Sequence, residues 1–367
     1  MTQSLPVLMY HYISNYPSSI SVSPHNFEKH CQGMAENGWR GITLQEAESF
    51  FLKGEKLPPK SVLITFDDGF LDNFVYAWPI LKKYEHSGVI FTVTERILSE
   101  QIVRPTLFDV WDKSISNKVL YELVDMPIKQ TKLGLKKRQD VFLSWEECRI
   151  MEKSGVISIG AHSAHHLSVF ANNTWKDIYI PSDQHRTFYK IDAPIVWGMP
   201  CFKEKSALHC KAFIPSNKLT ELITYHVPQQ KQQAYEYFQQ PHNITSLKQK
   251  IQTLSSNSLG SFETWGQQQK RLISDFEQCK NTLEKELGHN VQSFCWPWGE
   301  SSIIAQRIGK NFGFSYFYKT SMGANPSKKY TAINRFKVRN KGWNWLRWRL
   351  EIYSRIMPAT VYAKIRI

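Results

Sequence analysis

Short, continuous apolar runs recur along the chain, and longer segments with a helical pattern separate them. The clearest runs lie at residues 7–10, 62–66, 88–93 and 156–159. Because these runs lack the alternation of a half-exposed strand, they are typical of strands that are buried on both faces. Buried strands that alternate with helices predict an α/β fold with a parallel sheet, either open or closed into a barrel.

Local signals mark the helices between these strands. Ser23 followed by Pro24 is typical of the N-cap and first position of a helix, and Gly38 is expected to end that helix. Ser144 and Glu147 form a capping-box pattern, which predicts the start of a further helix before the run at 156–159. The sequence therefore predicts a strand-and-helix rhythm throughout its first part.

The regular rhythm stops at about residue 171 and returns at about residue 264. The segment between them is rich in Gln, Asn and Ser and follows neither the strand period nor the helix period. A long amphipathic helix and short strands near 291–296, 314–318 and 333–338 are expected after it. We therefore expect a domain at residues 1–170 and 264–340, an insertion lobe at 171–263, and a basic amphipathic tail at 341–367.

The composition is that of a folded protein in a reducing compartment. Of the 367 residues, 42% are hydrophobic and 21% are charged, so intrinsic disorder is not expected. The cysteines are scattered without a CxxC pair, and we expect no bridge even between Cys201 and Cys210. The apolar stretch at 6–10 is too short for a signal peptide, and no apolar run is long enough to span a membrane. We therefore expect the chain to stay in the cytoplasm.

Positive charge is concentrated at the end of the chain. The formal net charge is +14, and residues 335–367 contain nine Lys or Arg against one acid, Glu351. On a helix over 342–357, tryptophans and leucines gather on a wide apolar arc, with Arg347 and Arg355 opposite. That pattern is typical of a helix at an anionic membrane surface, and equally of a terminal helix docked on the domain. Nucleic acid is not an expected partner, because no reading motif accompanies the charge.

Two adjacent carboxylates, Asp67 and Asp68, follow the apolar run at 62–66, and Gly69 allows a tight turn after them. In parallel-sheet folds, the loops at the carboxyl ends of the strands hold the ligands. Neighbouring carboxylates repel each other and are unfavourable to bury, which favours a bound cation nearby. A solvated Asp-Asp-Gly turn is the alternative interpretation.

Three histidines cluster directly after the apolar run at 156–159. His162 and His166 are four residues apart, so their imidazoles converge on one ion if the segment turns helically. Imidazole combined with carboxylate suits zinc and similar divalent ions. A histidine-rich surface loop is the alternative, and His165 is expected to be a non-ligand.

Two further motifs are less specific by themselves. The aromatic segment at 294–299 (Phe-Cys-Trp-Pro-Trp-Gly) is as typical of a core strand and turn as of a site. His11 ends the first apolar run, where a structural histidine is the more ordinary interpretation.

In this order, the motifs at 9–11, 66–69, 162–166 and 294–299 resemble those of the polysaccharide deacetylases of carbohydrate esterase family 4, the NodB-homology group. The similarity is greatest to the branch that includes poly-N-acetylglucosamine deacetylases. It covers residues 5–170 and 264–340, and an N-terminal Met-Tyr-His stands where other members have a Leu-His motif near their end. The resemblance implies a distorted (β/α) barrel of the NodB type, with a long insertion and a basic C-terminal helix.

The resemblance also implies a metal-dependent hydrolase that removes the acetyl group of an N-acetylated sugar. Asp68, His162 and His166 would bind a divalent metal, with zinc as the default and cobalt, nickel or manganese as alternatives. Asp67 would be the general base that takes a proton from the attacking water, and His11 the general acid that protonates the leaving amine. Such an ion polarises the acetyl carbonyl and acidifies water.

Three more residues are assigned to substrate binding by the resemblance: Trp296, Trp298 and Arg335. The tryptophans would pack on a sugar face or on the acetyl methyl group, although packing in the core is equally open for each. The third motif lacks the arginine that many members use to orient the base, and Cys295 lies in that neighbourhood. Arg335 would replace it, or is a plain surface arginine. A backbone amide near Trp298 would hold the developing oxyanion.

The expected substrate is an N-acetylated sugar or glycan, and the basic tail at 341–367 suits a lipid-linked or cell-envelope precursor at a membrane surface. A deformylase that uses the same site is the alternative enzyme, and a catalytically idle carbohydrate-binding relative is the alternative from another class. A nucleic-acid-binding protein is the third interpretation. No protein partner can be deduced.

Overall fold

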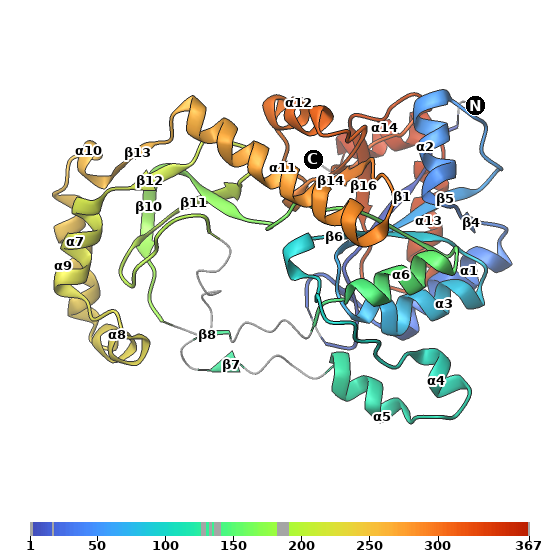
Figure 1. Ribbon diagram of the computed structural model, residues 1–367, viewed down its shortest axis with the longest axis horizontal. Helices are drawn as coiled ribbons and strands as arrows, with labels where there is room; N and C mark the ends of the chain where they lie inside the picture. The colour runs from blue at the N-terminus through green and yellow to red at the C-terminus, as the bar shows by residue number, and fades with distance from the viewer. Residues whose placement is uncertain are drawn as a thin grey trace.

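The computed structural model describes residues 3–16, 18–125, 130–131, 134–135, 141–181 and 191–365. Two parts lie side by side in Figure 1: a barrel with its surrounding helices, and a lobe of strands and short helices reached along one long helix. Arg366, which belongs to the basic tail of the sequence, lies outside the described residues.

Parallel strands form one sheet that closes on itself. In spatial order the strands are β1 (Val7–Tyr10), β16 (Ile333–Lys337), β15 (Tyr316–Thr320), β14 (Ser293–Cys295), β9 (Ile157–Ala161), β6 (Gly88–Thr92), β5 (Ser61–Asp68) and β4 (Arg40–Gly41). Because β1 also pairs with β5, the sheet is a closed barrel, and β4 extends it outside β5. A single residue pair, Phe294 with Ala161, joins β14 to β9 and distorts the barrel there. The predicted α/β fold is confirmed, and of the two forms left open it is the barrel.

Helices surround this barrel. They are α1 (Pro24–Glu36), α2 (Leu44–Lys53), α3 (Trp78–Lys83), α4 (Leu107–Trp111), α5 (Asn117–Leu120), α6 (Trp145–Lys153), α11 (Trp265–Leu287), α12 (Ile303–Asn311), α13 (Trp343–Tyr353) and α14 (Ile356–Ile365). Shorter elements are η1 (Asn73–Ala77), η2 (Thr94–Arg96), η3 (Tyr121–Asp125), η5 (Pro297–Gly299), β2 (Tyr12–Ile13), β3 (Ser21–Val22), β7 (Gln130–Thr131) and β8 (Gly134–Leu135).

The predicted helix starts are found where expected. Ser23 caps α1 and accepts a hydrogen bond from the backbone N–H of Asn26. Ser144 and Glu147 form the predicted capping box at the start of α6. These side chains satisfy backbone N–H groups that have no partner within the helix, which is why the local sequence alone located them.

Alternation along the strands separates two hydrophobic clusters. On β5, Val62, Ile64 and Phe66 belong to the cluster that packs against the outer helices. Leu63 belongs to a second cluster, together with residues of other strands and of α2. Because side chains alternate between the two faces of a strand, Asp67 lies on the same face as Leu63, which directs it toward the inside of the barrel.

The lobe has its own hydrophobic cluster. Its elements are β10 (Ser168–Ile178), β11 (Pro200–Ser206), β12 (Phe213–Pro215), β13 (Gly260–Phe262), α7 (Asn217–His226), α8 (Lys231–Phe238), α9 (Pro241–Gln252) and α10 (Ser256–Leu259). The strands form two antiparallel pairs, and register shifts interrupt the pairing of β10 with β11. These interruptions and the short helices explain why no regular period marked this segment. The expected limits of the lobe, 171–263, stay a prediction.

The C-terminal tail packs on the barrel as two helices. The predicted single helix over 342–357 is wrong, because α13 ends at Tyr353 and α14 begins at Ile356. Tyr353 stacks on Phe336 of β16 with ring centroids 4.5 Å apart, and Leu346 and Leu350 are fully buried. Much of the expected apolar arc is therefore used for docking. Within the described residues, no helix is both long and apolar enough to cross a membrane.

A glycine in α1 makes room for the tail. A Cβ atom placed on Gly33 would lie 2.3 Å from the ring of Trp343 in α13. We predict that Gly33→Ala lowers the free energy of unfolding by about 1–3 kcal/mol, because the helices must move apart. Gly266→Ala in α11 is the matched control, since nothing lies within 4 Å of its Cβ. It should be neutral or stabilising by up to about 1 kcal/mol. Urea unfolding measures both, and equal effects would contradict this account of the docking.

Candidate active site

The chemistry-bearing residues meet at the carboxyl ends of the barrel strands. His11 directly follows β1, Asp67 and Asp68 end β5, and His162 directly follows β9. In a closed parallel barrel these ends lie at one rim, so residues far apart in the sequence become neighbours. The structure brings all four together, as the sequence motifs predicted.

Three side chains form a cluster that could hold a metal ion. Asp68, His162 and His166 are buried, and their ligand atoms all lie within 4.8 Å of one another. Asp68 Oδ1 is 3.5 Å from His166 Nε2 and 3.9 Å from His162 Nε2. Donors about 2.1 Å from a tetrahedral ion are roughly 3.4 Å apart. One carboxylate and two imidazoles at these separations therefore fit a zinc-type ion with a coordination position to spare.

Neighbouring groups orient the ligands. His162 Nδ1 lies 2.9 Å from the backbone carbonyl of Cys295, which leaves Nε2 directed at Asp68. Burial lowers the pKa of His162, although Asp67 and Asp68 partly oppose this, so the neutral imidazole that a metal requires is favoured. Burial by itself would raise the pKa of Asp68, but His166, Arg96 and His162 lower it well below its usual value.

The two histidines converge through a turn that is not helical. The chain from His162 to His166 forms a bend in which Ser163 has φ 70° and His166 has φ 53°. The Ser163 hydroxyl accepts a hydrogen bond from the backbone N–H of His166 at 2.8 Å. Asp68 and Trp298 also have positive φ, at 75° and 54°. Such conformations are unfavourable for residues other than glycine and tend to gather at functional sites.

A buried arginine holds Asp67. Arg335 Nη1 donates to Asp67 Oδ1 at 2.6 Å and Nη2 donates to Oδ2 at 2.7 Å, with a further bond to Thr65. Burial would raise the pKa of Asp67, but Arg335 in first place, with His162 and His11, lowers it to about 2. Asp67 is therefore a carboxylate at neutral pH, although it is fully buried.

Arg335 thus contacts the carboxylate rather than the solvent. Its exposed fraction is 1%, which excludes the alternative of a plain surface arginine. It also corrects the assignment to substrate binding, because a side chain so enclosed does not reach a substrate. Arg335 supplies from β16 the contact to Asp67 that, by the resemblance, an arginine of the third motif makes in other members.

The remaining predicted residues differ in position. His11 is partly buried, and its Nε2 lies 3.9 Å from Asp67 Oδ2. Trp298 is 41% exposed and its ring centroid is 4.1 Å from that of His166, so it lies at the opening of the site. Trp296 is only 2% exposed and stacks on Phe317, so of its two interpretations the structure favours packing in the core.

Sequence reasoning missed two contacts to the carboxylates. Arg96 in η2, just beyond the end of β6, places Nη1 3.1 Å from Asp68 Oδ1. The Cys295 thiol lies 3.6 Å from Asp67 Oδ1, and with His162 these form a second group of metal-ligand type. Arg96 stands in no motif, and Cys295, although it lies in the segment at 294–299, was not expected to contact Asp67. The position of Arg96 after a buried strand was the signal available for it.

The Arg335–Asp67 pair makes a prediction about stability. Arg335→Gln leaves a buried carboxylate without its partner. We therefore expect the free energy of unfolding to fall by about 3–5 kcal/mol at pH 7. Because the folded pKa of Asp67 is lowered, the contribution of the pair is complete above about pH 4 and is lost toward pH 2. The deficit of the variant should therefore shrink at low pH.

Urea unfolding at pH 7 and pH 3, with a chelator present, measures this deficit. The double variant Asp67→Asn/Arg335→Gln should recover part of the loss, because no unpaired charge is then buried. Arg40→Gln is the control, because Arg40 pairs with Glu46 at the surface. Its replacement should lower the free energy of unfolding by less than about 1 kcal/mol. A deficit that is the same at both pH values would refute the assignment.

Comparison with known proteins gives consistent matches. Residues 54–191, which contain Asp67, Asp68, His162 and His166, match the family model for polysaccharide deacetylase. YxkH of Bacillus subtilis (strain 168), a protein of this family by name, is 42% identical over 93 residues, or 25% of this chain and 33% of that protein. The poly-beta-1,6-N-acetyl-D-glucosamine N-deacetylase of Escherichia coli (strain K12) is 20% identical over 307 residues, or 84% of this chain and 32% of its own.

The chain therefore spans about a third of the length of these curated relatives. A solved structure of a de-N-acetylase from Aggregatibacter actinomycetemcomitans has a TM-score of 0.58 and 16% identity, and the match covers 94% of this chain and 98% of that one. At this identity the likeness establishes the fold, which is the distorted barrel that the motifs implied. The recognised motifs, the family-model match over residues 54–191 and the fold agree, and the chain is similar to polysaccharide deacetylases, among them a poly-beta-1,6-N-acetyl-D-glucosamine N-deacetylase.

Proposed function

We propose that this protein is a metal-dependent hydrolase that removes the acetyl group of an N-acetylated amino sugar, releasing acetate and leaving the free amine. One observation carries the proposal: the Asp68, His162 and His166 cluster lies beside Asp67, whose carboxylate is held by the buried Arg335. The match of residues 54–191 to the polysaccharide deacetylase model supports it, and the name of the Escherichia coli relative states this reaction for that protein.

Asp68, His162 and His166 would hold one divalent cation, with zinc as the default for this donor set. When bound, the cation supplies Lewis-acid polarisation of the acetyl carbonyl and makes a water more acidic. The low pKa of Asp67, about 2, is itself an argument for such a cation. So weak a base is effective only if the acidity of the attacking water has been raised.

Asp67 would act as the general base. Arg335 donates one hydrogen bond to each carboxylate oxygen of Asp67. Each oxygen keeps a second lone pair, which can accept a proton from water. His11 would act as the general acid that donates a proton to the departing nitrogen. Its Nε2 lies 3.9 Å from Asp67 Oδ2, so the two groups approach the same point. The exposed Trp298 would pack on the sugar or the acetyl methyl group, and a backbone N–H nearby would stabilise the oxyanion.

The metal and the reaction are tested on the same samples. We expect about one metal per chain and acetate release from N-acetylglucosamine oligomers by the wild type. His162→Ala should lose both, because one of three ligands is removed. Asp67→Asn should keep the metal and lose activity by about 10²- to 10⁴-fold, because the base is lost. His242→Ala, an exposed histidine of α9, is the control that should keep both.

Metal content is measured by elemental analysis, and acetate and formate are measured together. Release of formate in place of acetate from matched substrates would replace the deacetylase proposal by a deformylase. A wild type without metal that added zinc or cobalt cannot activate would overturn the metal assignment.

We further propose that the tail contacts an anionic membrane from the cytoplasmic side, where a lipid-linked or envelope glycan precursor would be the substrate. Met357, Val361 and Ile365 follow one another at a spacing of four on α14 and are 77%, 52% and 76% exposed. Trp348 of α13 is 68% exposed. Exposed basic residues accompany these side chains, namely Arg347, Arg355 and Lys364. Apolar stripes with basic neighbours are typical of interfacial helices.

All six cysteines are free, which supports a reducing compartment.

Sedimentation with vesicles tests this contact. At low salt the protein should bind phosphatidylglycerol-containing vesicles and bind pure phosphatidylcholine vesicles weakly. Met357→Ser/Val361→Ser should weaken binding by about tenfold or more, because each apolar side chain contributes up to about 1.5 kcal/mol at an interface. Ile303→Ser is the control, being 79% exposed on α12. Equal binding to both vesicle types, or none at low salt, would contradict the proposal.

A further inference from the structure

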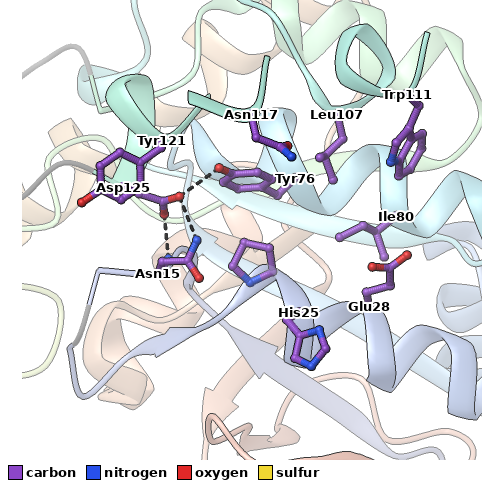
Figure 2. A pocket seen from close by; sticks show the side chains of 11 residues that line it. Asn15, His25, Glu28, Tyr76, Ile80, Leu107, Trp111, Asn117, Tyr121 and Asp125 are labelled. Atoms are coloured by element: carbon purple, nitrogen blue, oxygen red, sulfur yellow. Dashed lines mark hydrogen bonds between the residues drawn. The ribbon is translucent and has the colours of Figure 1, made fainter. Parts of the chain in front are cut away.

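A second pocket, separate from the carboxylate–histidine cluster, lies beside the barrel. Its volume is about 380 Å³, and its walls come from the loop after β2, the start of α1, η1 with α3, and the segment from α4 to η3. Figure 2 shows a polar end formed around Asp125 and an apolar side toward Ile80, Leu107 and Trp111. A volume of this size lies in the range of ordinary small-molecule sites.

Hydrogen bonds to a buried carboxylate organise the polar end of the pocket. The Asp125 carboxylate is 3% exposed and accepts hydrogen bonds from Ser14 Oγ at 2.7 Å and from Tyr76 OH at 2.9 Å. The backbone N–H and side-chain amide of Asn15 also donate to it, at 2.6 and 3.0 Å. These bonds fix the Asn15 amide and the Tyr76 hydroxyl at the edge of the pocket, where each retains acceptor capacity. The pocket therefore presents oriented polar groups without having to rearrange.

The opposite side offers aromatic surface. Trp111 is 42% exposed and Tyr121 is 50% exposed, and both line the pocket. Phe108 contacts the Trp111 ring edge-on with centroids 5.6 Å apart, and Lys83 lies 5.3 Å from its centroid, so the ring is held in place. Rigid aromatic rings provide contact area at a low entropic cost.

The charged side chains of the lining do not favour an anionic ligand. Two acids, Asp125 and Glu28, line the pocket together with His25, and Glu28 is paired with Lys83 at 2.7 Å. The buried Asp72 lies near enough for Asp125 to help raise its pKa, after the larger effect of burial. In a chain of net charge +14, an acidic pocket does not attract phosphate or carboxylate groups. Hydroxyl groups and C–H faces together match this lining, which is the surface that a pyranose ring presents.

We propose that this pocket binds one sugar ring of a glycan chain, as a distal subsite of the enzyme; the inference rests on the proposed function. Asn15 follows His11 by four residues, so their Cα atoms are at most about 14 Å apart. One oligosaccharide can therefore reach the pocket while another of its units lies at Asp67. The subsite favours long chains over single sugars, because it adds contacts remote from the reacting bond.

Kinetics on substrates of two lengths test the subsite. For a β-1,6-linked N-acetylglucosamine pentamer, Trp111→Ala and Tyr121→Ala should each raise KM about three- to tenfold, because each removes one aromatic contact to the sugar. The value of kcat should not change. Kinetics on a single-unit N-acetylglucosamine glycoside should not change. Trp265→Ala is the matched control, since Trp265 is 46% exposed on α11 and does not line the pocket. Using two pocket variants guards against one of them failing to fold.

Binding measured by calorimetry on the Asp67→Asn protein separates the sugar types. The acetylated pentamer and its fully deacetylated form are compared, and weaker binding of either when Trp111→Ala is added supports the subsite. Pentamer KM and affinity within twofold of the wild type in both pocket variants would overturn it. If no acetylated sugar is hydrolysed at all, the proposed function fails, whereas the calorimetry still decides whether the pocket binds a sugar.

Discussion

Closure of the barrel is the constraint on which the rest of this structure depends. β1 pairs with β5 on one side and with β16 on the other, so the two ends of the domain sequence are joined in one ring. This closure places the ends of strands formed near residues 10, 67, 161 and 295 at one rim, and it brings β16 with Arg335 beside β5. In an open sheet with the same strand order, β16 would lie next to one end of the sheet and β5 near the other, so Arg335 could not reach Asp67.

At that rim, buried charges replace hydrophobic packing. Asp67 is balanced by Arg335 and Asp68 by Arg96, while burial lowers the pKa of His162. Carboxylates this deep are stable only with such partners, since an isolated buried charge is very unfavourable. The surroundings of the two acids differ: Asp67 accepts hydrogen bonds on both oxygens from Arg335, whereas Asp68 accepts one from Arg96 and faces two imidazoles. That difference is the physical basis for assigning them different roles.

Three features lie outside the barrel: the C-terminal tail, the pocket and the lobe. The tail buries Leu346, Leu350 and Tyr353 on the barrel and leaves a stripe of apolar and basic side chains on its outer side. The pocket beside the barrel is formed by short helical turns that carry both aromatic and amide side chains. The lobe has a hydrophobic cluster of its own. The proposals of membrane contact and of a distal sugar subsite rest on the first two of these features.

The sequence by itself determined the strands of the closed barrel, the N-caps of α1 and α6, and the candidate ligands Asp68, His162 and His166, because these depend on local periods and short motifs. The tertiary structure alone decided between an open and a closed sheet, between a surface and a buried Arg335, and between one tail helix and two. It also decided that His162 and His166 meet through a bend with positive φ and that Trp296 packs in the core. The contacts of Arg96 and Cys295 came from it alone. These outcomes depend on contacts between residues far apart in the chain, and no local pattern records such contacts.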